Sequence, residues 1–164
     1  MPDLVFIDGM HLVEFALRDF MHAEQLAAPH GLIVIDDIFP NHPVQAARER
    51  RTYAWTGDVW KIRPILSRYR PDLYLLSLDT WGTGLLLVAG LDPTNRVLFD
   101  NYDSIVDVYG RACEPPKEIL NRTGAVPPNR ATLGRLMELL KQLRGGKLNS
   151  NELATQLRAQ QTVA

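Results

Sequence analysis

The sequence predicts an α/β fold in which a partial parallel sheet ends in an antiparallel hairpin and is followed by a C-terminal helical tail. Two unbroken apolar runs, at residues 4–7 and 32–35, are typical of strands buried on both faces. Apolar residues at helical spacing lie between these runs. A short glycine-containing link joins two later apolar runs, at 72–78 and 85–91, and favours a hairpin.

The first three predicted elements form a βαβ unit. The strand at 4–7 stops at Asp8-Gly9, and the strand at 32–35 stops at Asp36-Asp37. The helix between them is predicted from apolar residues at helical spacing: Val13, Ala16, Leu17, Phe20 and Ala27. Pro29-His30-Gly31 ends this helix. We expect a right-handed crossover that joins two parallel strands.

The segment after this unit is predicted to hold two further helices. The first covers about residues 44–53 and would carry three arginines on a solvated face. These are Arg48, Arg50 and Arg51. The second covers 59–69, with Pro64 in its first turn or at a kink. The hairpin strands then complete the sheet.

We expect three regions along the chain. Residues 1–93 form the α/β part, 94–129 form a connecting segment interrupted by proline pairs, and 130–164 form a helical tail. The tail repeats leucine on one helical face, at Leu133, Leu136, Leu140 and Leu143. It carries six Lys and Arg against two Glu, and this positive charge is interpreted as a solvated helix surface.

Composition excludes several classes of protein. The chain has 164 residues, of which 46% are hydrophobic and 23% are charged, as in a folded domain. A single cysteine excludes an internal disulfide framework and favours a reducing, cytoplasmic location. The formal net charge of −1 gives no electrostatic reason to expect binding to nucleic acid or to an anionic membrane. No uncharged apolar stretch reaches the ~18 residues of a membrane span, and the first residues lack the pattern of a signal peptide.

Three carboxylates follow the first two strands. If these strands are neighbours about 4.8 Å apart, Asp8, Asp36 and Asp37 meet at the sheet edge where α/β proteins bind ligands. Crowded carboxylates repel one another, and a hard divalent cation such as Mg²⁺ removes that conflict. We therefore predict that Asp8, Asp36 and Asp37 are metal ligands. The alternative is that they cap the helices or turns that follow.

His11 stands three residues after Asp8, beside the predicted metal. An imidazole there can accept a proton from a substrate hydroxyl near neutral pH. The alternative is a histidine at a helix start without a catalytic task. Trp55 and Trp60, with Asp58 between them, are interpreted either as walls of an acceptor pocket or as packing anchors.

With these residues in place, the chain resembles the C-terminal half of a class I S-adenosylmethionine-dependent methyltransferase. The resemblance is carried by Asp3-Leu-Val-Phe-Ile-Asp-Gly-Met-His11 and by His30-Gly-Leu-Ile-Val-Ile-Asp-Asp37. The pattern of these residues is similar to that of the metal-dependent O-methyltransferases of the macrolide-sugar type and their bacterial relatives. Residues 55–61 and 83–93 extend the resemblance to about Pro93.

The resemblance implies a partial Rossmann-like sheet and a set of site roles. Asp8, Asp36 and Asp37 would hold Mg²⁺, His11 would be the general base, and Asp8 would also belong to the cofactor site. Residues 4–91 would supply the fourth to seventh strands of the methyltransferase fold. The cofactor would be S-adenosylmethionine, and the acceptor would be a hydroxyl of a small molecule.

The chain departs from the family at the cofactor site, because no Gly-x-Gly motif follows a strand and opens a helix. We therefore expect a truncated domain, inactive alone, whose strand at Leu4–Ile7 is a bare sheet edge open to self-association or to a partner chain. Two other functions stay open at this point. One is a non-enzymatic interaction module that pairs through this edge, and the other is a metal-dependent phosphohydrolase-like or receiver-type domain.

Overall fold

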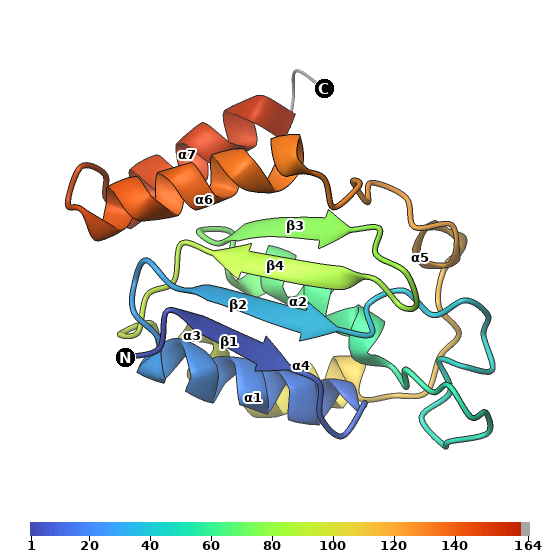
Figure 1. Ribbon diagram of the computed structural model, residues 1–164. Helices are drawn as coiled ribbons and strands as arrows, with labels where there is room; N and C mark the ends of the chain where they lie inside the picture. The colour runs from blue at the N-terminus through green and yellow to red at the C-terminus, as the bar shows by residue number, and fades with distance from the viewer. Residues whose placement is uncertain (162–164) are drawn as a thin grey trace.

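The computed structural model describes residues 1–161, so residues 162–164 of the predicted tail lie outside the described residues. It shows an α/β fold in which helices cover both faces of one sheet (Figure 1). The elements are β1 (Leu4–Ile7), α1 (Val13–Leu26), β2 (Leu32–Asp36), a 3₁₀ turn (Val59–Lys61), α2 (Ile62–Tyr69), β3 (Tyr74–Leu78), β4 (Leu85–Ala89), α3 (Val97–Asp100), α4 (Tyr102–Tyr109), α5 (Lys117–Leu120), α6 (Arg130–Arg144) and α7 (Ser150–Gln161).

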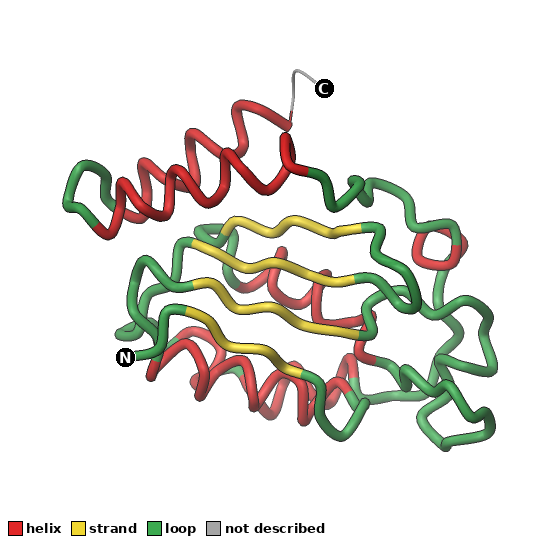
Figure 2. The backbone as a smooth tube through the Cα atoms, viewed as in Figure 1, coloured by secondary structure: helices red, strands yellow, loops and turns green. Residues whose placement is uncertain are grey.

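The sheet has the strand order β1-β2-β4-β3 (Figure 2). β1 and β2 are parallel, with Leu4 opposite Leu32 and Ile7 opposite Ile35. β3 and β4 are antiparallel, which confirms the predicted hairpin, and β4 lies between β3 and β2. The result is a mixed four-stranded sheet, consistent with the partial Rossmann-like fold expected from the sequence.

Two apolar cores fill the space on the two faces of the sheet. The first lies between the sheet and α1 and α2, where Leu17, Phe20 and Ile33 are fully buried, and Leu98 and Ile105 of α3 and α4 join it. The second core lies under α6 and α7. It joins strand residues such as Val34, Leu76 and Leu87 to Leu136, Leu139 and Leu140 of α6 and to Leu153 and Leu157 of α7.

One predicted helix is absent. Residues 44–53 form turns and bends rather than a helix. Arg48, expected on a solvated face, forms ion pairs with Glu14 at 2.5 Å and with Asp58 at 2.8 Å. Trp55 donates its indole N–H to the carbonyl of Ala47 at 2.6 Å. These long-range contacts hold the segment in a folded loop, and local spacing could not report them.

The second predicted helix is present as the 3₁₀ turn at Val59–Lys61 followed by α2, with Pro64 in the first turn of α2. Proline is tolerated there because the N–H that it lacks has no partner within the helix. No helix among residues 1–161 is long and apolar enough to cross a membrane.

Candidate functional site

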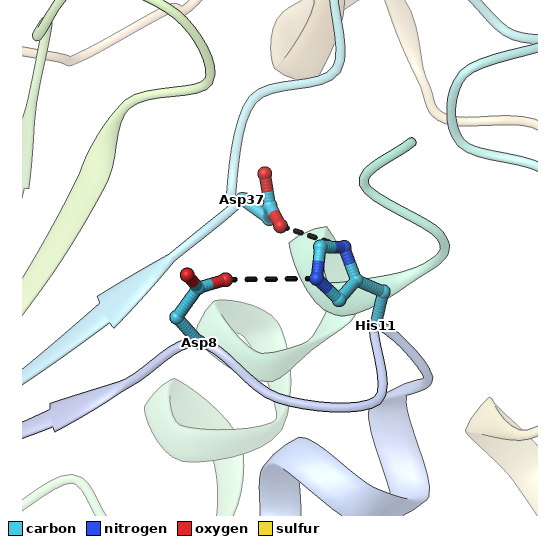
Figure 3. Close-up of side chains that lie close together, drawn as sticks. All are labelled: Asp8, His11 and Asp37. Atoms are coloured by element: carbon cyan, nitrogen blue, oxygen red, sulfur yellow. Dashed lines mark ion pairs between the residues drawn. The ribbon is translucent and has the colours of Figure 1, made fainter. Parts of the chain in front are cut away.

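Three of the predicted site residues meet at the carboxyl ends of β1 and β2 (Figure 3). Asp8 follows β1 directly, Asp37 follows β2 directly, and His11 lies in the loop between β1 and α1. One ligand atom from each of these residues lies within 4.8 Å of the others. The parallel pairing of β1 and β2 thus brings His11 together with Asp8 and Asp37, two of the three carboxylates expected to converge.

The imidazole of His11 lies between the two carboxylates. Its Nε2 is 3.5 Å from Oδ1 of Asp8, and its Nδ1 is 2.8 Å from Oδ2 of Asp37. Nδ1 also lies 2.6 Å from the carbonyl oxygen of Trp55, and the Trp55 and His11 rings stack with centroids 5.3 Å apart. A carbonyl oxygen can only accept, so Nδ1 carries a proton. Nε2 is therefore the nitrogen that accepts a proton when the ring is neutral.

Asp36 lines the same pocket but directs its carboxylate elsewhere. Its Oδ1 accepts the backbone N–H of Asp37 at 2.7 Å and the hydroxyl of Thr83 at 3.2 Å. The structure therefore brings Asp8 and Asp37 together with His11. It holds Asp36 beside them, against the loop that precedes β4. Thr83 is a site residue that the sequence pattern did not single out.

Asp37 is the most enclosed of the three acids, with 9% of its surface exposed. Burial raises the pKa of its carboxyl above the ordinary value. The Thr83 hydroxyl and His11 oppose this rise, whereas the neighbouring carboxylates of Asp36 and Asp8 add to it. A buried acid that faces a second acid is a place where a cation lowers the electrostatic cost.

The backbone around the site is strained. Met10, His11 and Asp37 have positive φ angles of 21°, 51° and 64°, in the region that side-chain-bearing residues rarely adopt. Each such residue costs on the order of 1–3 kcal/mol and persists only where its surroundings hold it. Three of them within one cluster indicate that packing imposes this geometry.

The segment 55–58 supplies that packing. Gly57 has a φ of 53°, and a Cβ atom on it would overlap the carbonyl oxygen of His11. Asp58 follows and is fully buried; its Oδ1 accepts the N–H of Val13 at 2.8 Å, at the start of α1. Gly57 thus packs against the backbone of His11, and Asp58 holds the backbone of Val13 two residues later.

A buried charge network anchors Asp58 in turn. Its Oδ2 accepts from Lys61 at 2.8 Å and from Arg48 at 2.8 Å, and Arg48 pairs with Glu14 of α1. The Nζ of Lys61 also donates to the carbonyls of Tyr109 and Arg111. No sequence pattern indicates this network, apart from the position of Asp58 between the two tryptophans.

A pocket of about 610 Å³ opens over the cluster. Its lining is Asp8, Met10, His11, Leu12, Asp36, Asp37, Gln45, Arg50, Tyr53, Ala54, Trp55 and Thr83. Trp55 is a wall of this pocket, as one interpretation of the sequence expected. Trp60 is 7% exposed and is not among the lining residues, so it serves as a packing anchor.

Comparison with known proteins bears on the same part of the chain. Residues 2–38 match the family model described as a methyltransferase domain. The matched segment spans β1, α1 and β2 and contains Asp8, His11, Asp36 and Asp37. A search of curated proteins and a search of solved structures each returned no match.

The family match supports a methyltransferase domain and a methyltransferase-like function. The match ends at Ile38, before the loop that carries Trp55, Gly57 and Asp58. The site thus combines a segment that matches the family model with a loop that lies beyond the match.

Proposed function

We propose that this chain is the acceptor-binding and metal-binding part of an S-adenosylmethionine-dependent O-methyltransferase that acts on a small-molecule hydroxyl. The observation that carries the proposal is the convergence of Asp8, His11 and Asp37 inside a segment that matches a methyltransferase domain. The pocket over these residues is large enough for a small molecule.

The donor set fits a divalent cation. Asp8 is half exposed and Asp37 is buried, and their oxygens lie within 4.8 Å of the same imidazole. Two carboxylates with room for water and substrate oxygens are a common arrangement for Mg²⁺. Asp8 and Asp37 would hold the metal. Asp36, the third ligand that the sequence predicts, could join them only after its carboxylate turns away from the hydroxyl of Thr83. A cation there would favour the ionised form of a bound hydroxyl.

His11 is the proposed general base. Nδ1 donates to the Trp55 carbonyl and lies 2.8 Å from Oδ2 of Asp37, which leaves Nε2 to take the proton of an acceptor hydroxyl in the pocket. Asp37 then stabilises the imidazolium that forms. S-adenosylmethionine, when bound, supplies an electrophilic methyl group. The proton taken from the acceptor hydroxyl would stay on Nε2 of His11.

We find no glycine-rich cofactor turn of such an enzyme in the part of the chain that the structure describes. Within residues 1–161, no Gly-x-Gly turn joins a strand to a helix, and Gly82 and Gly84 lie in the link between β3 and β4. We therefore propose that the chain alone transfers no methyl group. A titration of the isolated chain with S-adenosylmethionine tests this part, and micromolar affinity would contradict it.

A titration with Mg²⁺, followed through the NMR shifts of the site residues, tests the metal proposal. Asp8→Asn and Asp37→Asn should each weaken binding by at least the ~10-fold that loss of a supporting residue costs a metal site. His11→Gln should leave Mg²⁺ affinity within about threefold if His11 is a base rather than a ligand. Loss of Mg²⁺ binding in His11→Gln would refute that role.

The phosphohydrolase-like alternative has weaker support, because no lysine is among the residues that line the site pocket. Lys61, which binds Asp58 behind the site, donates to that carboxylate and to two backbone carbonyls. A specific observation favours the interaction-module alternative: Leu4 and Phe6 of the edge strand β1 are 62% and 56% exposed.

A further inference from the structure

The edge strand β1 exposes one apolar face. Val5 and Ile7 pack toward α1 in the first core, so Leu4 and Phe6 point to the other face of the sheet. Phe6 stands opposite Val34 of β2, and Val34 is buried with the leucines of α6. The cover provided by α6 and α7 therefore reaches Val34 of β2 but leaves Leu4 and Phe6 of β1 exposed.

The side of α6 that borders this uncovered strip is basic. Met137, Lys141 and Arg144 lie four and three residues apart and share one helical face. Arg144 bonds to Asp3 at 2.9 Å, which places this face above the start of β1. Met137 is 47% exposed, and Lys141 is exposed. We name the surface formed by Leu4, Phe6, Met137, Lys141 and Arg144 the β1–α6 shelf.

The β3 edge of the sheet is covered by other segments of the chain, whereas the β1 edge is not covered by any described residue. Beyond β3, Val126 exchanges backbone hydrogen bonds with Ser77 and Asp79, both at 2.9 Å, and Arg158 donates to the carbonyl of Leu73. β1 has no such neighbour among the described residues, and its four residues contain no lysine or proline. Proteins commonly protect an exposed edge with one of these devices.

We propose that the β1–α6 shelf receives a strand and an attached amphipathic helix from a partner polypeptide. The strand would pair with β1, and the apolar side of the helix would cover Leu4 and Phe6. Acidic residues on that helix would face Lys141, beside Arg144 and its partner Asp3, so the partner is expected to carry an acidic helix. A strand with helices on both faces is the usual setting of a parallel β-strand, and β1 has a helix on one face alone.

A second copy of the chain fits the shelf less well. Antiparallel pairing of two β1 strands can place Leu4 opposite the Phe6 of the other copy on the same face. It supplies no helix above them, because the α6 of each copy packs on Val34 of its own β2 and leaves Leu4 and Phe6 exposed. The apolar face would stay uncovered, and two basic walls would face the same opening.

The proposal does not rest on the metal site, but it has a consequence for it. A strand added to β1 would run past Asp8 at the carboxyl end of the sheet. Ligands of α/β sheets bind in the crevice outside those ends. The partner would then form a wall of the site pocket on the side that β1 leaves open.

Two synthetic peptides test the proposal. Each joins an alternating apolar strand to the same amphipathic helix, and they differ in having Glu or Lys at the polar positions. Fluorescence anisotropy measures their binding to the full chain. We expect the acidic peptide to bind at least tenfold more tightly than the basic one, and hydrogen exchange to show new protection of the β1 amides.

Variants locate the binding. Phe6→Thr keeps a strand-forming residue but removes the aromatic surface, and it should weaken the acidic peptide at least fivefold. Lys141→Glu should reduce the preference for the acidic peptide by a similar factor. Val108→Thr changes a residue that is 60% exposed on α4, away from the shelf, and should change nothing.

Three results would overturn the proposal. One is equal affinity for the two peptides, and another is binding that Phe6→Thr does not weaken. The third is a concentration-dependent dimer, seen by light scattering and lost in Phe6→Thr, without binding of either peptide; this result would assign the edge to a second copy. A circular dichroism melt of each variant confirms that it is folded before the comparison is made.

Discussion

Gly57→Ala should displace His11, because one methyl group has no room there. A Cβ atom at residue 57 would overlap the carbonyl oxygen of His11 and lie 2.8 Å from its carbonyl carbon, whereas ordinary contacts begin near 3.4 Å. Relief requires residue 57 or the His11 carbonyl to move by well over 1 Å. A movement of that size away from Trp55 stretches the 2.6 Å bond from His11 Nδ1 to the Trp55 carbonyl beyond ~3.6 Å, at which it is no longer a hydrogen bond.

Long-range proton–nitrogen NMR of the imidazole measures this displacement. We expect the Nδ1-protonated form of His11 to lose its dominance in Gly57→Ala, together with a stability loss of about 1–3 kcal/mol. Gly124→Ala is the matched control, since Gly124 also has a positive φ, 77°, but nothing lies within 4 Å of its Cβ position. It should cost only the φ penalty of about 1 kcal/mol and leave His11 unchanged. Unchanged His11 signals in Gly57→Ala would refute the packing argument.

Two further predictions concern buried charges. Asp58→Asn should lower the free energy of unfolding by about 3–5 kcal/mol in urea denaturation, because Lys61 would keep a buried charge without its anion; Asp58→Asn with Lys61→Met should recover part of that loss, and a double variant as unstable as the single one would contradict this. Burial raises the pKa of Glu24 above its ordinary value near 4.5, so the folded state binds the extra proton and stability falls as pH rises from 4.5 through the raised value. Urea midpoints measured across this pH range should fall less in Glu24→Gln than in the unchanged chain. If the two plots of midpoint against pH run parallel, Glu24 is not the cause of the loss of stability.

The strands of the fold were predictable because their signals are local. β1 coincides with the predicted run at 4–7, and β2 extends the predicted run by one residue, to Asp36. Asp8 follows β1 directly and Asp36 is the last residue of β2, so each strand ends where its apolar run meets an aspartate. The position of β4 between β2 and β3 does not follow from local patterns, because strand order depends on contacts between segments far apart in the sequence.

The site was predictable in part for the same reason. Asp8 and His11 are three residues apart, and their meeting with Asp37 follows from parallel strands of known spacing. The role of Gly57 in holding His11 was not predictable, because the two residues are far apart along the chain and share no pattern. Residues 44–53 show the converse error, in which local helical spacing was outweighed by the pairing of Arg48 with Glu14 and Asp58.

The single carboxylate of Asp58 links the start of α1 to a loop that lies 45 residues further along the chain. The turn that carries His11 therefore depends on a contact that closes late, since long loops lose more entropy on closure than short ones. We expect the site to assemble after the βαβ unit during folding. On warming, it should open before the sheet melts, as a local unit of lower stability. Any ligand that binds His11 and Asp37 would then slow this opening.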